Sequence, residues 1–376
     1  MAGRAGIRQV HDGDRTAVNA LLAEGGFKQR SAAGWSWLFE QNPALTPETP
    51  PGWVLERDGA VVGYLGNHPV RYAWGERELR AVTCSAWYVR SDARAQSTEL
   101  LTAWFRQRGA QVFVSTTANE ASGPAYGLFK AKRPRGASFG TAWIWVASDA
   151  AVLRYGARTR LPGAVAGLAP VAGVGGPMAR LVRRVAGLGH APRTRFHGTI
   201  DAIELSAVGR DFDLLWGTVR TQGGLRVWRD ATALRWSLAD PDTASPPVVL
   251  AARVRGQLVG YVAGRRHEGG AVDLPQLRVL DLVVHPEHTA AAPALIRGLV
   301  EQARALGLGL VYCAPGGEEL AGLLEGTRPR VVTRPHGAHF IRTRRLKDLP
   351  DPAEGHWQAT PLDGDIPFAM SDPGAP

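Results

Sequence analysis

The sequence of 376 residues predicts an α/β fold, of the mixed α+β sheet type, in two tandem domains that each have a mixed central sheet flanked by helices. Three observations predict this fold. The chain is longer than the roughly 250–300 residues at which one hydrophobic core stops growing. Apolar residues make up 45% of it, which is enough to fill two cores. The same order of helices and strands occurs in both halves, which is typical of a duplication.

The duplication is visible in two segments about 200 residues apart. Residues 35–69 contain a tryptophan-bearing helix, an Asn-Pro stop, a Pro-rich loop and two strands joined by a turn, and residues 234–266 have a similar order. The matching positions are Trp37 with Trp236, Pro43 with Pro241, and Val62-Gly63-Tyr64 with Val259-Gly260-Tyr261. The offsets of 199, 198 and 197 residues drift by only two, so chance is a poor explanation.

The elements are predicted from hydrophobic periodicity and from stop signals. The run "AVTCSAWY" at 81–88 consists of strand-forming residues, Pro43 ends the tryptophan-bearing helix, and Ser97 is a good N-cap for the helix that follows it. In order, the first half is predicted to form a strand at 6–10, helices at 14–24 and 32–41, strands at 52–57, 60–72 and 81–90, a helix at 97–108, a strand at 111–117, a helix at 121–131 and a strand at 138–147. The second half is predicted to form a strand at 199–207, helices at 210–221 and 229–239, strands at 248–255, 258–267 and 277–285, a helix at 290–306, a strand at 309–314, a helix at 317–326 and a strand at 336–346. Each half is therefore an antiparallel meander followed by one βαβ crossover.

Domain boundaries follow from this pattern and from the charges. We expect an N-terminal domain at 1–150, an Arg/Gly/Pro-rich linker at 151–198, a C-terminal domain at 199–346 and a tail at 347–376. The net charge is +10, and the linker contains eight arginines but no Asp or Glu between Arg154 and Arg195. Such a segment can hold phosphates, an acidic carrier protein or an anionic membrane surface, or it can be a solvated connector. A helix with an apolar stripe is predicted at 178–188, where it would pack between the two halves or, as the alternative, lie on a partner surface.

Several classes of protein are disfavoured. Cys84 and Cys313 lie in apolar runs without CxxC spacing, so neither a disulfide framework nor a zinc site is indicated. No apolar segment of a secretion signal follows Met1, and the uncharged run at 161–179 is too rich in Pro and Gly for a membrane helix. We therefore expect a cytoplasmic protein without a metal or a DNA partner; membrane association is possible but is not predicted.

The element order, with a polar turn between the fourth strand and the third helix, resembles that of the GCN5-related N-acetyltransferase (GNAT) superfamily. The resemblance covers about 1–148 and 199–346. The Trp-rich helix that ends in Pro makes the chain similar to bacterial tandem acyltransferases of this superfamily. The resemblance implies an N-acyltransferase that moves an acyl group from acyl-CoA, or from the 4′-phosphopantetheine of an acyl carrier protein, to a primary amine of a sugar, peptide or small metabolite by direct attack in a ternary complex.

Two alternatives remain open at this stage. Fem-like transferases, which use aminoacyl-tRNA, are also tandem versions of this fold, although no basic patch interleaved with aromatic residues marks RNA binding in this sequence. A catalytically inactive scaffold with the GNAT fold that only binds a partner is the other alternative.

The polar turn "VRSDARAQSTELL" at 89–101 corresponds to the superfamily's loop for the pyrophosphate of coenzyme A. Backbone N–H groups and the start of the next helix favour an anion at such a turn. Arg94 matches the family's cation, whereas Ser97 and Glu99 replace small residues of the motif. In the second half Thr289 replaces the cation, so we expect the donor site in the first half; a site in the second half, or no site, is the alternative. The donor residues implied are Tyr88, Val89, Arg94, Gln96, Ser97 and Thr98.

N-acyl transfer needs a proton acceptor for the amine, donors for the oxyanion and a hydroxyl that can protonate the departing thiolate. The fourth strand of the first half has no carboxylate, and Ser85 is its candidate catalytic residue beside Cys84. Tyr126 is a candidate hydroxyl, because the family's Tyr falls one helical turn later, at Phe129; the alternative is a half-buried aromatic residue. Asn119 is either a contact to pantetheine or a helix cap.

The second half contributes a candidate base. Asp281 lies among apolar residues of the fourth strand, and an unpaired buried carboxylate has a raised pKa that suits a base. The alternatives are that Asp281 faces solvent or pairs with Arg278. His285, at the end of the same strand, is a second candidate base or a surface histidine.

Overall fold

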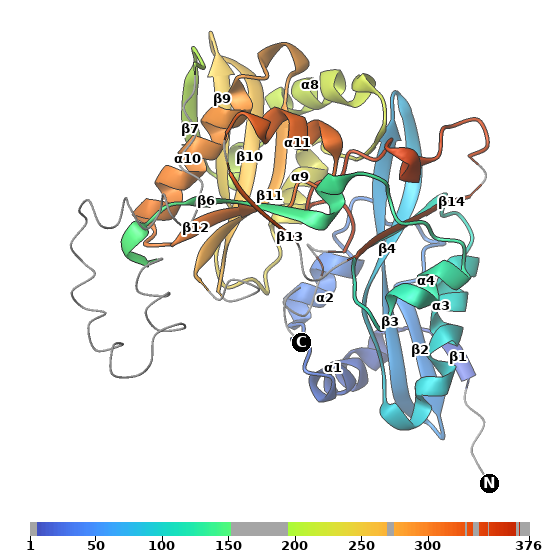
Figure 1. The fold of residues 1–376 in the computed structure, drawn as a ribbon. Coiled ribbons are helices and arrows are strands. Elements are labelled where there is room, and N and C mark those ends of the chain that lie inside the picture. Colours follow the sequence, from blue (N-terminus) through green and yellow to red (C-terminus); the bar gives the residue numbers. More distant parts are fainter. Residues whose placement is uncertain are drawn as a thin grey trace. The chain divides into compact units, whose positions relative to one another are not determined.

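The computed structural model describes residues 6–151, 195–268, 274–327, 329–333, 338–344, 346–365 and 368 (Figure 1). Most of the expected linker, including its helix at 178–188, lies outside these residues. The chain forms two compact units. Unit 1 consists of the described residues of 1–135, 220–244 and 336–376, and unit 2 of those of 136–219 and 245–335. The units therefore depart from the expected boundaries at 150 and 199, because each contains segments of both halves.

Unit 1 is built on a mixed sheet of seven strands. The path through the sheet is β1 (Gly6–Gln9), β2 (Gly52–Arg57), β3 (Ala60–Trp74), β4 (Arg77–Val89), β5 (Val112–Ala118) and β14 (Ala338–Thr343), and the short strand β8 (Leu225–Val227) pairs with β3. Of these pairs only β4 with β5 is parallel. The meander and the crossover predicted from the sequence are both present.

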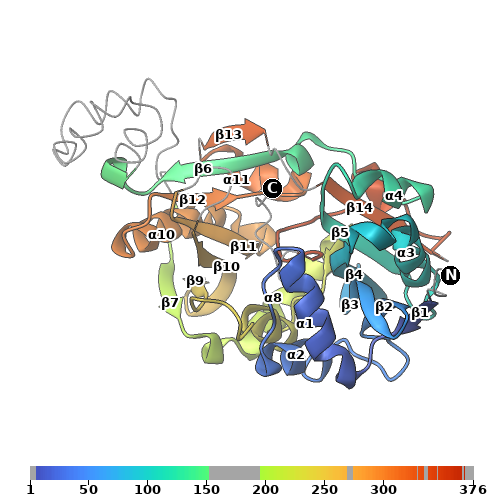
Figure 2. The ribbon, with the colours of Figure 1, turned by 90° about the horizontal axis from the view of Figure 1, so that it is seen from below.

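Helices cover both faces of this sheet (Figure 2). They are α1 (Arg15–Glu24), α2 (Ala32–Phe39), α3 (Ser97–Arg106), α4 (Gly123–Leu128) and α9 (Ala231–Leu238), with 3₁₀ turns at Asp12–Asp14, Ser91–Gln96, Arg220–Gln222 and Pro352–Glu354. Leu100, Trp104 and Tyr126 fill the core on the α3 and α4 side. Val18 and Trp35 belong to the core on the α1 and α2 side. Residues on both faces of the central strands β3 and β4 are thus buried, whereas the edge strand β1 has no buried residue.

The repeated tryptophan helices lie together in unit 1. Side-chain caps begin both helices: Ser31 accepts from the Gly34 N–H before α2, and Asp230 accepts from the Ala233 N–H before α9. The rings of Trp37 and Trp236 stack with centroids 5.0 Å apart. Each indole N–H donates to the other residue's backbone oxygen at 2.9 Å. The duplicated residues therefore form one reciprocal pair.

Unit 2 contains a second mixed sheet of seven strands. Its order is β13 (Arg330–Thr333), β6 (Thr141–Val146), β12 (Leu310–Cys313), β11 (Gln276–Val284), β10 (Gln257–His267), β9 (Val248–Val254) and β7 (Thr199–Ile203). The helices of unit 2 are α8 (Arg210–Val219), α10 (Ala291–Ala305) and α11 (Glu318–Glu325), with 3₁₀ turns at Ala137–Gly140, Leu205–Ala207 and Pro286–His288. None of the helices in the described ranges has the length and apolarity needed to cross a membrane.

The last strand of each half lies in the sheet of the other half. The strand expected at 138–147 forms as β6, but it pairs with β12 and β13 in unit 2. The strand expected at 336–346 forms as β14, but it pairs with β5 in unit 1. The sequence predicts the strands and not this exchange, because the alternation of apolar residues specifies which face of a strand is buried and not which strand lies beside it.

The repeated glycine has the same role in both sheets. Gly63 pairs with Val89 and Gly260 with Val284. A side chain on Gly63 would begin 3.4 Å from Leu100 of α3 and 3.0 Å from the neighbouring strand residue Val89. A side chain on Gly260 would meet α10 and β11 in the same way. The glycine of the repeated triplet lets the helix after the fourth strand pack closely on the sheet.

Candidate functional site

The candidate site lies in unit 1, where β4 and β5 separate. The two strands pair through Ala81 with Val112, Val82 with Phe113, and Thr83 with Val114. In the described sheet they do not pair beyond this point, although β4 continues to Val89. A bulge interrupts the β3–β4 register here, and Ala86 has a φ of 54°, which is unusual for a residue other than glycine. Strained backbone of this kind is concentrated at functional sites.

Ser85 lies beside this bulge and faces a histidine. Its hydroxyl is 2.6 Å from Nε2 of His68 on β3, and both side chains are buried. Gly66 lies opposite Ser85 in the strand register. A side chain on Gly66 would begin 2.8 Å from Oη of Tyr64, 3.2 Å from Nε2 of His68 and 3.2 Å from the backbone oxygen of Ser85. Three polar atoms thus crowd the position that a side chain of the buried Gly66 would take.

His68 is neutral in the folded protein. Burial, assisted by the charge of Arg30, lowers its pKa to about 3. Its Nδ1 has no hydrogen-bond partner within the described chain. An unpaired buried N–H is less tolerable than an unpaired acceptor, so the proton of the neutral ring is expected on Nε2, which then donates to Ser85. The hydroxyl proton of Ser85 is therefore left free to donate elsewhere.

The C-terminal tail crosses this side of the sheet. Asp365 accepts from the backbone N–H and hydroxyl of Thr116 on β5, and also from the hydroxyl of Thr117. Burial raises the pKa of the Asp365 carboxyl above its usual range, against the effect of these hydrogen bonds. Further along the tail, the ring of Phe368 lies 4.9 Å from that of His68. The tail therefore reaches from β5 to β3, the two strands that flank Ser85 on β4.

Tyr126 lies on the opposite face of the sheet from Ser85. Its hydroxyl is 3.2 Å from Sγ of Cys84, and it belongs to the buried cluster of α3 and α4. Burial raises the pKa of Tyr126 well above its usual range. The phenol stacks on Phe340 and contacts Trp87 and Trp104 edge-on. The structure thus brings Tyr126 to Cys84 and not to Ser85.

The predicted donor loop is a 3₁₀ turn that continues directly into α3. Arg94 is exposed, as is Thr98, whereas Ser97 and Gln96 are half-buried. Ser97 is the first residue of α3 and not its N-cap, so that part of the prediction was wrong; the cap is Gln96, without a side-chain bond. The 3₁₀ turn replaces the extended residue that a Ser cap requires.

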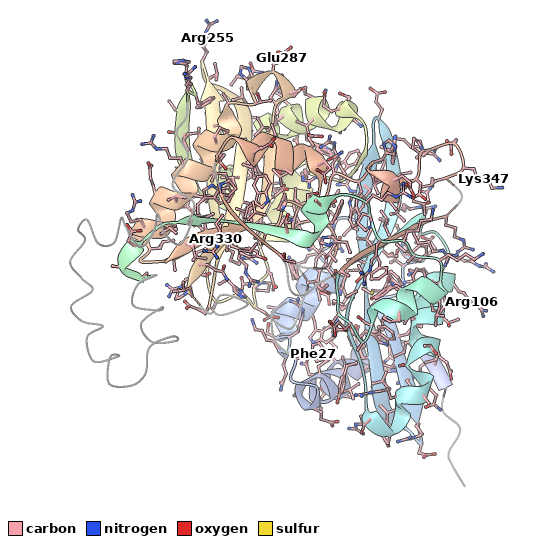
Figure 3. All side chains as sticks on the ribbon, in the orientation of Figure 1. Phe27, Arg106, Arg255, Glu287, Arg330 and Lys347 are labelled. Atoms are coloured by element: carbon pink, nitrogen blue, oxygen red, sulfur yellow. The ribbon has the colours of Figure 1, made fainter. Side chains whose placement is uncertain are left out.

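The other predicted donor contacts have structural partners. Val89 is buried and pairs with Gly63. Tyr88 is half-buried and packs against Phe27, which is labelled in Figure 3. Asn119 is exposed; its side chain accepts from the Ser122 N–H, and its own N–H donates to the Ser122 hydroxyl. Asn119 therefore caps the turn before α4 in the structure described.

Asp281, the predicted base of the second half, belongs to unit 2. Its side chain is fully buried, and it accepts a hydrogen bond of 2.6 Å from the hydroxyl of Tyr261. Tyr261 is the repeat counterpart of Tyr64. His285 accepts from the N–H of Glu287 at the start of the next turn. Ala292 is buried at the start of α10.

Sequence reasoning missed His68, Tyr64 and Asp365. His68 is a titratable residue inside the long strand-forming run 60–74, and that position was its only signal. Asp365 lies in a tail with no periodicity, so nothing in the sequence links it to Thr116. In the part of the chain that the structure describes, no group of three or more His, Cys, Asp or Glu side chains is placed to hold a metal ion.

No protein-family model and no curated protein matches the sequence. Solved structures do match. A GCN5-related N-acetyltransferase from Anabaena variabilis is 12% identical, with a TM-score of 0.54 over 90% of this chain and 73% of that one. Eis1 from Mycobacterium abscessus is 15% identical, with a TM-score of 0.51 over 90% and 73%. N-myristoyltransferase from Saccharomyces cerevisiae, solved with myristoyl-CoA, is 11% identical, with a TM-score of 0.52 over 94% and 86%.

Proposed function

Because the chain has the fold of the GCN5-related N-acetyltransferases, we propose that it is an acyltransferase that uses the gap between β4 and β5 of unit 1. The donor is acyl-CoA or the phosphopantetheine thioester of an acyl carrier protein. The acceptor is a primary amine of a sugar, peptide or small metabolite, which attacks the thioester directly in a ternary complex. The observation that carries the proposal is the end of β4–β5 pairing at Thr83 and Val114, next to the bulge and the Ser85 hydroxyl.

The gap suits a pantetheine arm. Beyond Thr83 and Val114, each strand has backbone groups that no longer bond to the other strand. The Thr116 N–H of β5 is already bonded to Asp365, but the other groups need partners, which the two amides of pantetheine can supply as an added strand would. The acyl-CoA named for the yeast N-myristoyltransferase structure supports the same class of donor.

The start of α3 supports the location of the phosphate end. Arg94 is exposed there and has no ion pair among the described residues, so its charge is available to a phosphate. Thr98 is also exposed in the first turn of α3. The helix start adds a partial positive charge, which Glu99 in the same turn opposes. A donor with a single phosphodiester, as on a carrier protein, depends less on this loop than coenzyme A does.

Ser85 is the proposed proton donor to the departing thiolate. After the amine attacks, the C–S bond breaks and the sulfur carries the negative charge. Ser85 passes its hydroxyl proton to the sulfur and is reprotonated from Nε2 of His68, while Nδ1 of His68 takes up the proton that the amine loses. His68 stays neutral overall, which agrees with its low pKa. Tyr126 remains the second candidate hydroxyl, and Asp281 remains a candidate base in unit 2.

Two measurements test this function. Calorimetric titration with acetyl-CoA and longer acyl-CoAs is expected to show binding, which Arg94→Ala weakens. Turnover with the same acyl group on coenzyme A and on an acyl carrier protein identifies the donor. Absence of affinity for both donors would refute the proposal. If the protein instead bound charged tRNA, with an affinity that fell steeply as the salt concentration rose, a Fem-like transferase would be indicated.

A cytoplasmic location is also proposed. Cys84 and Cys313 are both buried free thiols. This state is typical of a reducing compartment. Fractionation of cells that express the full chain tests the location.

A further inference from the structure

Cationic side chains of unit 1 gather on the face of the sheet that α3 and α4 cover. The two helices lie side by side on this face (Figure 1, Figure 2), and Arg106 at the end of α3 is labelled in Figure 3. The cations come from the end of α3, from the segment after α4 and from β14, and they are exposed or half-buried: Arg106, Arg108, Lys130, Arg133, Arg342 and Arg344. We call these six residues the basic face.

Stacked rings bring the end of α3, the end of α4 and β14 together. The guanidinium of Arg342 on β14 lies 5.2 Å from the centre of the Phe105 ring on α3. Phe105 in turn stacks on Phe129, the residue after α4, with ring centroids 4.8 Å apart. Lys130 follows Phe129 directly and is exposed. Cations from three distant parts of the chain are therefore neighbours on one surface.

The other cations of the basic face are tied to the same elements. Arg133 lies over the ring of Phe340 on β14, at 5.3 Å from its centre. Arg344 donates to the backbone oxygen of Gln107, at the end of α3, at 3.2 Å. Burial and the charge of Arg344 lower the pKa of the Arg342 guanidinium. Like charges therefore lie close enough here to repel each other.

No carboxylate neutralises this charge. Within the part of the chain that the structure describes, the six residues of the basic face form no ion pair, although the neighbouring Lys132 pairs with Asp351. Glu99 and Glu120, the acidic residues of α3 and of the turn before α4, pair with none of the six. A surface that keeps so much unpaired charge of one sign attracts partners of the opposite sign.

An apolar strip on α4 borders the basic face. The helix contains no charged residue, and Pro124 and Leu128 lie one turn apart on its exposed side. Leu128 is 76% exposed, more than any other large apolar side chain in the described ranges. Lys130 follows the end of α4, and the guanidinium of Arg133 comes within 3.8 Å of the position that a side chain on Gly123 would take. Cations thus lie at both ends of the strip.

We propose that the basic face and Leu128 form a docking surface for an anionic phospholipid bilayer. Lys and Arg side chains are attracted to the negative potential of such a bilayer, and an exposed leucine enters the boundary between headgroups and acyl chains. A nucleic acid would match the charges but offers no apolar environment for Leu128, and the rings of Phe105 and Phe129 are stacked on each other and not free to stack on bases. The inference goes beyond the proposed function and does not depend on it.

Co-sedimentation of the full chain with lipid vesicles, without any acyl donor, tests the inference. Vesicles of phosphatidylcholine and phosphatidylglycerol in equal amounts are expected to bind the protein, whereas vesicles of phosphatidylcholine alone are not. Binding should weaken as the NaCl concentration rises, because salt screens the attraction. Arg106→Gln and Arg108→Gln each remove one exposed charge and should each weaken binding about 5-fold, as expected for one cation near an anionic surface.

The apolar part of the surface has its own variant and controls. Leu128→Ser should weaken vesicle binding about 5-fold, because it removes the side chain that enters the bilayer. The controls lie in unit 2: Leu214→Ser removes a leucine that is 66% exposed, and Arg255→Gln removes an exposed arginine labelled in Figure 3. Both should bind vesicles as the wild type does. Equal binding by Leu128→Ser, Arg106→Gln and the controls would overturn the inference.

A fluorescent label reports the position of residue 128 directly. Cys84 and Cys313 are buried, so Leu128→Cys adds an exposed thiol that an environment-sensitive dye can modify selectively. The emission of the dye should shift to shorter wavelength when the anionic vesicles are added, and the same dye on Leu214→Cys should show no shift. An unchanged spectrum at residue 128 would contradict the proposal. So would arginine variants that lose affinity for tRNA but keep their affinity for vesicles.

Discussion

His68 makes the stability of the protein depend on pH in a way that can be calculated. An unfolded histidine has a pKa of about 6.5, whereas burial lowers that of folded His68 to about 3. Between these values the unfolded chain binds one proton more than the folded chain, so the free energy of unfolding falls as the pH falls, by about 1.4 kcal/mol per pH unit. Between pH 7.5 and pH 5.0 this single ring is expected to cost about 2 kcal/mol.

Urea unfolding of the full chain, followed by tryptophan fluorescence at pH 7.5 and 5.0, measures this cost. In His68→Gln the titrating ring is absent, so the acid-induced loss should be about 2 kcal/mol smaller than in the wild type. Ser85→Ala removes the 2.6 Å hydrogen bond but keeps the ring, so its loss should match that of the wild type. Equal losses in wild type and His68→Gln would refute the reasoning.

Three further predictions follow from the contacts described. Arg94→Ala should weaken acetyl-CoA binding several-fold in calorimetry and leave the Tm unchanged, because the side chain is exposed; Arg106→Ala, at the other end of α3, should leave binding unchanged (Figure 3). Asp363→Ala removes the buried 2.8 Å ion pair between Asp363 and Arg229, so chemical unfolding should show a loss of about 3–5 kcal/mol, and a loss below 1 would contradict the importance of this pair. Leu299→Ala, in the unit 2 core, should cost about 2–5 kcal/mol in the same assay, unless the cavity collapses.

The type and order of the elements could be predicted from the sequence, because buried faces repeat with the period of a helix or a strand. The strand pairings of 141–146 and 338–343 could not, since an antiparallel edge accepts any strand of suitable length and pattern. The candidate site was predicted in part. Ser85 was found from the position of its strand in the resemblance, but His68 faces it from a neighbouring strand. That contact depends on register, which the sequence around His68 does not specify.

The tail illustrates the same limit. Two of its buried residues have partners that lie far away along the chain. Trp357 is buried and forms a β-bridge with Leu225, while Asp365 is held by residues of β5 about 250 positions earlier. Contacts between such distant irregular segments leave no periodic signal. The composition of the tail alone is compatible with disorder. In the structure, its described residues belong to unit 1.

The exchange of β6 and β14 makes the duplicated halves dependent on each other. A chain cut between residues 151 and 195 gives a front fragment without the strand that completes β5, and a rear fragment without the strand that lies between β12 and β13. Each fragment would present a bare hydrogen-bonding edge, which favours aggregation. Neither half is therefore expected to fold as a free-standing module, even if only one of them retains a thioester site. A half without any catalytic residue would still be needed, because it supplies the strand that completes the sheet of the other half.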